Sequence, residues 1–210
     1  MERPGPGHPG PAPHPEPAGP AGADALALRP ATPADAAMIA AIHVRSWRAV
    51  YRGILPDAYL DDAADAERLD HWSRMLDRPD PSLLVLLLTG ADGVLGFVAG
   101  RMPADDGYDS YIDNLHVDPA RRGGGLGRRL LGAAAEAFLA RGARNLFLWL
   151  FDGNAPAGRF YARLGGVVAE HDFDDFAGAR IPHTRIVFPD LAALAAACRS
   201  GTGTPAAPGG

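Results

Sequence analysis

The chain has 210 residues, of which 47% are hydrophobic, and its formal net charge is −5. This is enough for one globular domain with a sizeable core, and the acidic balance argues against a polyanion-binding protein. The sequence contains no lysine, which excludes a Walker-type P-loop, and no run approaches the roughly 20 apolar residues of a membrane span.

Both ends of the chain are predicted to be disordered tails. Residues 1–24 are mostly Pro, Gly and Ala, and residues 200–210 have the same composition. The N-terminus also lacks the basic-then-apolar pattern of a signal peptide, so we expect a cytoplasmic protein. The folded domain is expected over residues 25–199.

The first half of this domain is predicted to contain a strand, two helices and three strands. Residues 25–32 alternate as a short strand does, and Thr32, Pro33 and Asp35 then form a helix N-cap signature. Apolar residues at helical spacing extend that helix to about Val50. The elements expected next are a helix over 64–76 and strands over 82–88, 94–101 and 110–117.

The second half begins with a helix that ends near Gly142, predicted from the spacing of its apolar residues. Residues 145–151 are too continuously apolar for an edge strand and suit a central one. A short helix stopped by Gly165 follows, and then strands over 167–173 and 179–188. This order predicts an α/β fold, with a mixed sheet of six or seven strands and helices on both faces.

The turn between the strand at 110–117 and the next helix reads "VDPARRGGGLGRRL". Glycines let the backbone approach a bulky anion, and the unpaired N–H groups of a helix N-terminus stabilise phosphate. Arg122, Arg128 and Arg129 add charge suited to phosphate oxygens. The dinucleotide pattern Gly-x-Gly-x-x-Gly fails, because its last position falls on Arg128 or Leu130. We therefore expect a phosphate cradle of another kind.

The pattern that fits is Arg122-x-x-Gly125-x-Gly127, and with it the chain resembles the GCN5-related N-acetyltransferases, the GNAT superfamily. Their acetyl-CoA motif is Arg/Gln-x-x-Gly-x-Gly/Ala after a strand such as "IDNLHVDP". The later "NAPAGRFYARLGG" resembles a second family signature, with Gly166 in place of the usual Phe. The early "HVRSWRAVYRGILPDAYL" looks like many small bacterial members. The resemblance covers most of residues 25–188.

The resemblance implies acetyl-CoA as co-substrate. A metal site is not expected, because the acidic run "DFDD" lacks the spacing of a calcium loop. The glycine turn would hold the pyrophosphate, and the end of the strand at 110–117, splayed from its neighbour in the family, would pair with the pantetheine arm. Asn154 would bind that arm, cap a helix, or do both. The implied cofactor-binding residues are Leu115, His116, Val117, Arg122, Gly123, Gly124, Gly125, Leu126, Gly127, Arg128 and Asn154.

Transfer of an acetyl group to an amine needs a proton acceptor for the amine and can use a proton donor for the thiolate. Tyr161 matches the family tyrosine that is usually assigned as this donor. Asp113, acting through a water, is the first candidate for the base, while His116 and a chain of solvent molecules remain alternatives. Strand alternation places Asp113 on the same side as Tyr111 and His116 on the other side.

Trp47 and Tyr51 lie four residues apart on one predicted helix face, where they either bound the acceptor site or belong to the core. The acidic segments 105–109 and 170–175 would favour cationic acceptors, but solvated loop charge is the preferred explanation for them.

The sequence thus predicts an N-acetyltransferase that acts on a primary amine of a small molecule or peptide, by direct transfer in a ternary complex. The alternative is a catalytically silent acyl-CoA-binding regulatory module of the same fold. We expect no nucleic-acid or membrane partner, and the family resemblance favours a homodimer. Cys198, the only cysteine, is interpreted as a small packing residue, with no zinc cluster or internal disulfide.

Overall fold

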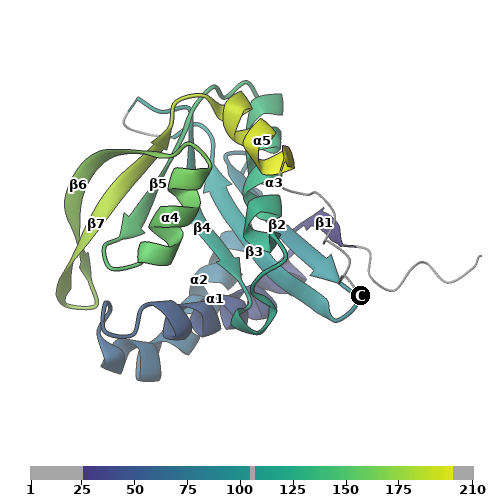
Figure 1. Cartoon of the computed structure of the whole chain (residues 1–210). Helices are drawn as coiled ribbons and strands as arrows, with labels where there is room; N and C mark the ends of the chain where they lie inside the picture. Colours follow the sequence, from purple (N-terminus) through teal and green to yellow (C-terminus); the bar gives the residue numbers. More distant parts are fainter. Residues whose placement is uncertain (1–25, 105–106, 201–210) are drawn as a thin grey trace, which may run out of the picture.

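The computed structural model of the chain describes residues 26–104 and 107–200 (Figure 1). The predicted tails lie outside these residues, apart from Ser200, which ends a helix. The described strands are β1 (Ala27–Pro30), β2 (Leu83–Gly90), β3 (Gly93–Arg101), β4 (Ser110–Val117), β5 (Leu146–Phe151), β6 (Val167–Phe176) and β7 (Ala179–Phe188). The described α-helices are α1 (Ala36–Val50), α2 (Ala64–Asp77), α3 (Leu126–Ala140), α4 (Ala155–Arg163) and α5 (Leu191–Ser200).

The strands form one mixed sheet in the order β1-β2-β3-β4-β5-β7-β6. Every neighbouring pair is antiparallel except β4 and β5, which are parallel. β5 lies inside the sheet between β4 and β7, as its continuous apolar sequence predicted. The predicted α/β class with a mixed sheet is confirmed.

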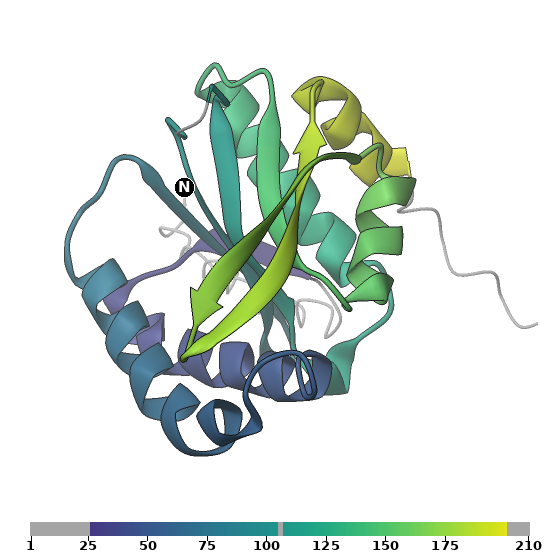
Figure 2. The same ribbon diagram turned by 90° about the vertical axis from the view of Figure 1, so that its left-hand side faces the viewer.

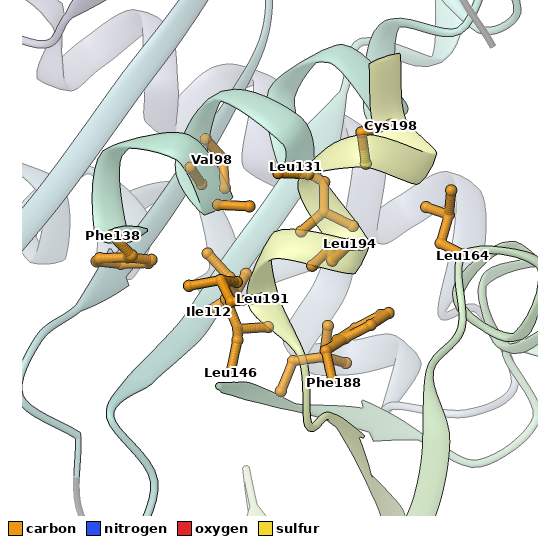
Figure 3. Packing of buried hydrophobic residues seen from close by; sticks show 14 of the residues in the cluster. Val98, Ile112, Leu131, Phe138, Leu146, Leu164, Phe188, Leu191, Leu194 and Cys198 are labelled. Carbon is orange, nitrogen blue, oxygen red and sulfur yellow. The ribbon is translucent and has the colours of Figure 1, made fainter. Parts of the chain in front are cut away.

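Helices cover both faces of the sheet (Figures 1 and 2). On one face, α3, α4 and α5 pack around a large core cluster that includes Phe138, Leu146 and Phe188 (Figure 3). On the other face, α1 and α2 pack around Trp72 and Phe97. None of the helices in the described part of the chain is long and apolar enough to cross a membrane.

The sequence did not predict α5, because its alanine-rich segment shows few large apolar residues. Leu191, Leu194 and Cys198 face the core from this helix and are almost fully buried. Cys198 packs so closely on α3 that a Cβ added to Gly132 would lie 2.8 Å from the cysteine Cβ. Its predicted packing role is confirmed. The segment Tyr59–Ala63, directly before the predicted helix over 64–76, forms a wide helical turn that leads into α2.

β4 contains one extra residue relative to β3. Ala99 pairs with Asn114 and Gly100 pairs with Ile112, so Asp113 has no partner across the ladder. This arrangement is a β-bulge, which shifts the alternation of every later side chain in the strand by one position.

The bulge overturns one expectation about the site. The Tyr111 hydroxyl donates a hydrogen bond to the Asp113 carboxylate at 3.1 Å. The charge of this carboxylate also raises the pKa of His71 of α2. Asp113 therefore lies on the same side of the sheet as Tyr111, as predicted. His116, however, hydrogen-bonds Ser46 of α1 at 3.1 Å and so lies on the same face. The prediction that His116 points to the opposite side is wrong, because simple alternation counts no bulge.

Candidate active site

A cavity of about 720 Å³ opens where β4 and β5 separate. The two strands pair only from Ser110↔Leu146 to Ile112↔Leu148, and beyond these residues they diverge. β3 continues to pair with the other edge of β4 as far as Val117. The edge of β4 that faces β5 therefore presents free backbone groups along one wall of the cavity. The splayed strand implied by the family resemblance is present.

The glycine turn forms one end of this cavity. Gly123, Gly124 and Gly125 all have positive φ, at 104°, 59° and 74°, which glycine adopts without strain. A Cβ at any of the three would have no neighbour within 4 Å, so these backbones border open space. Gly125 is the N-cap of α3, where the first amides have no intrahelical acceptor. The turn has the geometry of an anion cradle.

The cavity collects most of the sequence-predicted cofactor residues. Gly124 alone among them does not line the cavity, although it lies in the same turn. The predicted residues along the wall are Leu115, His116, Val117, Arg122, Gly123, Gly125, Leu126, Gly127, Arg128 and Asn154. The candidate catalytic residues Asp113 and Tyr161 also line it. Asn154 caps α4, because its side-chain oxygen accepts a hydrogen bond from Ala157 N at 3.3 Å.

Tyr161 reaches the cavity from α4 and belongs to the apolar cluster on the face of the sheet that α3, α4 and α5 cover. Burial raises the pKa of its hydroxyl well above the ordinary value, and the nearby Tyr51 raises it further. Its hydroxyl therefore stays protonated at neutral pH and has a proton to give. Tyr51 also lines the cavity; burial raises the pKa of its hydroxyl, and a hydrogen bond with Asn154 acts in the opposite direction.

On the α1/α2 side, Asp113 is exposed at the bulge of β4. Burial and the neighbouring Asp113 carboxylate raise the pKa of Tyr111 far above its ordinary value, so Tyr111 remains a hydrogen-bond donor to that carboxylate. The Tyr111 ring stacks on Phe147 of β5, with ring centroids 4.7 Å apart. Asp113 and Tyr161 thus lie on opposite sides of the gap between β4 and β5.

Two buried histidines, His43 of α1 and His116 of β4, pack together on the α1/α2 side of the sheet. The His43 and His116 rings lie 4.4 Å apart, and Trp72 Nε1 donates a hydrogen bond to His43 Nδ1 at 3.1 Å. His43 Nε2 is buried without a partner among the described residues. Burial lowers the pKa of His116 to about 3, with a further lowering by Arg122, and burial lowers the pKa of His43 as well. Both rings are therefore neutral, which suits packing residues.

Trp47, predicted as an acceptor-site residue or a core residue, is 7% exposed and packs against Tyr59 and Phe176. It does not line the cavity, in contrast to Tyr51, four residues later. The β6–β7 hairpin extends toward α1 (Figure 2), and its residues Phe176 and Ala179 belong to the same buried cluster as Trp47.

The acidic segments are less free than the sequence suggested. Asp109 accepts a hydrogen bond from the Arg144 backbone at 2.8 Å, and Glu170 forms an ion pair with Arg185 at 3.1 Å. Residues 105 and 106 lie outside the described part of the chain. These pairings support the interpretation of the acidic segments as structural charge.

Several cavity residues were missed by the sequence analysis: Ser46, Trp149, Phe160 and Arg163. Trp149 could have been found, since the strand that separates from β4 must form the opposite wall. Ser46 carries no such signal, because a serine inside an amphipathic helix has no typical role. In the described ranges, no cluster of three or more His, Cys, Asp or Glu side chains is arranged to hold a metal ion.

Comparison with known proteins gives a consistent picture. Residues 43–166 match the model of the acetyltransferase (GNAT) family. The chain is 32% identical over 173 residues to the uncharacterized N-acetyltransferase YuaI of Bacillus subtilis (strain 168), a match that covers 80% of this chain and 96% of that protein.

Solved structures share the fold. A GCN5-related N-acetyltransferase from Rhodopseudomonas palustris superposes with a TM-score of 0.63 at 27% identity, over 77% of this chain and 93% of that one. The acetyl-CoA complex of yncA from Salmonella typhimurium superposes with a TM-score of 0.54 at 21% identity, over 79% of this chain and 94% of that one. The match to the family model and the match to YuaI, together with the shared fold, show that the chain belongs to the GNAT family and is an N-acetyltransferase.

Proposed function

We propose that the chain transfers the acetyl group of acetyl-CoA directly to a primary amine of a small molecule or peptide, in a ternary complex. The observation that carries this proposal is the cavity itself, which joins the anion cradle of the glycine turn to the free edge of β4. The cradle suits a pyrophosphate, and the strand edge suits the amides of a pantetheine arm. The acetyl-CoA complex of yncA, which has the same fold, supports this choice of co-substrate.

The proposed reaction uses groups on both sides of the gap between β4 and β5. The amine approaches from the α1/α2 side, where Asp113 takes its proton through a water molecule as the nitrogen attacks the thioester carbon. A backbone amide on the free edge of β4 stabilises the oxyanion. The carbon–sulfur bond then breaks, and Tyr161, on the α4 side, donates its proton to the departing thiolate. Arg122, Arg128 and the turn amides hold the pyrophosphate throughout.

The base assignment favours Asp113 over His116. Asp113 is exposed at the point where β4 and β5 separate, whereas His116 is buried and its pKa is lowered to about 3. Asp113→Asn is expected to lower kcat by about 10²-fold or more and to leave acetyl-CoA affinity unchanged. Asp174→Asn is the matched control, because Asp174 acts on Tyr111 by charge but does not line the cavity. Equal turnover of wild type and Asp113→Asn would exclude Asp113 as the base.

The function itself is tested by incubating the full chain with acetyl-CoA and a panel of primary amines while free thiol is measured. We expect thiol release with at least one class of amine, together with a 42 Da increase in the mass of that amine. Tight acetyl-CoA binding without thiol release or acetylated product from any amine would instead identify a silent acyl-CoA-binding module.

A further inference from the structure

A second cavity of about 320 Å³ lies on the α1/α2 side of the sheet, beside the proposed approach of the amine. It is lined by side chains from α2, from the loop after α2 and from the end of β3: His71, Arg74, Met75, Arg78, Asp80 and Arg101. The lining therefore contains three guanidinium groups but only one carboxylate.

This cavity is linked to the proposed site by the sheet register. Arg101 of β3 is the cross-strand partner of Tyr111 of β4, so the two side chains stand on the same face. His71 connects the two places from the helix side, because it lines the second cavity and its pKa responds to the Asp113 carboxylate. An acceptor whose amine reaches Asp113 can extend another group toward these arginines.

The arginines differ in how far they are already neutralised. Arg101 contacts Asp80 at 2.6 Å, and Arg74 pairs with Asp70 within α2. Arg78 is exposed and forms no ion pair with any described residue. Burial lowers the pKa of His71, and Arg68, Arg74 and Arg101 lower it further against the opposing effect of Asp113. The cavity lining thus carries three guanidinium groups and one carboxylate, and Arg78 is left without an ion pair among the described residues.

Helix electrostatics explain only part of this arrangement. Cations are favoured near a helix C-terminus, which accounts for Arg74 and Arg78 at the end of α2. It does not account for Arg101, which converges on the same cavity from β3. Guanidinium groups from separate elements around one concave surface match the planar oxygens of a carboxylate or the oxygens of a phosphate.

We propose that the second cavity binds an anionic group of the acceptor, a carboxylate or a phosphate, so that the acceptor is a primary amine that also carries negative charge. The inference rests on the proposed acetyl transfer at Asp113. It also differs from the cationic acceptors that the acidic segments suggested.

Binding is tested first without turnover, on the full chain. The ring signals of His71, assigned with His71→Gln, are followed by NMR during titration with inorganic phosphate and, separately, with succinate. A bound anion stabilises the imidazolium form, so a saturable rise in the pKa of His71 is expected. The tighter of the two anions indicates whether the acceptor carries a phosphate or a carboxylate. No saturable change with either anion would overturn the proposal.

Variants make the assignment specific. Arg78→Gln, and then Arg78→Gln with Arg101→Gln, should weaken anion binding, the double variant by about tenfold or more. Arg78 is exposed and unpaired among the described residues, so the single variant preserves the fold. Arg159→Gln, an exposed arginine of α4 outside both cavities, is the matched control and should bind as wild type does. Equal affinity in all variants would contradict the proposed cavity.

Turnover then separates this inference from the proposed function. The anion that binds should inhibit thiol release competitively with the amine and not with acetyl-CoA, and Arg78→Gln should relieve the inhibition. Thiol release without such competition would overturn the acceptor class while acetyl transfer stands. No thiol release from any amine would overturn the proposed function, whereas the His71 titration would still report anion binding.

Discussion

At the scale of single residues, the proposed transfer depends on a tyrosine that keeps its proton and on an aspartate that accepts a proton through water. Burial in the α4 side of the cavity raises the pKa of Tyr161, which keeps the phenol protonated in the resting site. Asp113, in contrast, is exposed at the bulge of β4. Because Asp113 and Tyr161 lie on opposite sides of the gap between β4 and β5, Asp113 can take the proton of the amine nitrogen while Tyr161 protonates the thiolate sulfur.

Tyr161→Phe removes the proposed proton donor but retains the ring that packs in the α4 cluster. We expect kcat to fall by about 10²-fold or more while the dissociation constant of acetyl-CoA stays the same, because the donor acts only as the thiolate leaves. Steady-state kinetics with calorimetry of acetyl-CoA binding check this. Unchanged turnover would mean that Tyr161 serves only in packing.

At the scale of elements, the shape of β4 decides the site, and glycines of β3 permit that shape. A Cβ at Gly100 would lie 2.3 Å from the Tyr111 carbonyl oxygen, next to the bulge that exposes Asp113. A Cβ at Gly96 would lie 2.5 Å from the His116 carbonyl oxygen. The two strands can therefore approach as closely as they do only because β3 lacks side chains at these positions.

Gly100→Ala should consequently destabilise the protein by about 1–3 kcal/mol, as overpacking against a backbone atom does, and should lower turnover as β4 shifts. Gly158→Ala in α4 is the control, since its new Cβ would lie 3.7 Å from Leu150 and alanine favours a helix. Urea unfolding of both variants measures the difference. A Gly100→Ala protein as stable as wild type would contradict this account of the bulge.

Most elements could be predicted from the sequence because apolar spacing and cap residues act locally. Thr32 and Asp35 do form a capping box, and the glycine turn does precede α3. The bulge at Asp113 depends instead on pairing with a distant strand, so the side of His116 was mispredicted. Trp47 illustrates the same limit, because its burial depends on the β6–β7 hairpin, which local sequence around α1 does not encode.

At the scale of the whole molecule, the two buried histidines make stability depend on pH. His43 and His116 are neutral in the folded chain, with the His116 pKa lowered to about 3, while both would titrate near 6.5 when unfolded. The unfolded chain therefore binds more protons below pH 6.5, so their contribution is complete above that pH and is lost as the pH falls. Aspartates with lowered pKa values, such as Asp35, add to this loss only below about pH 4.

Between pH 6.5 and 4.5, the free energy of unfolding should fall by up to about 1.4 kcal/mol per pH unit for each histidine. Urea titrations at several pH values measure this slope. His116→Gln should reduce the slope, because one of the histidines whose pKa is lowered in the folded chain is gone. A free energy of unfolding that is constant over this range would show that these rings are protonated, or exposed, in the folded chain.

In the proposed reaction, the glycine turn and the start of α3 hold the pyrophosphate of acetyl-CoA. The most direct measurement is calorimetric titration of acetyl-CoA into wild type, into Arg122→Glu combined with Gly125→Asp, and into Arg159→Glu as the control. We predict that the affinity of the double variant for acetyl-CoA falls by about 100-fold or more, while its thermal unfolding temperature stays that of wild type. The reason is that the two new carboxylates repel the phosphates of the cofactor. The control should bind as wild type does. Unchanged acetyl-CoA affinity in the folded double variant would exclude the glycine turn as the pyrophosphate site, because the cofactor would then bind elsewhere.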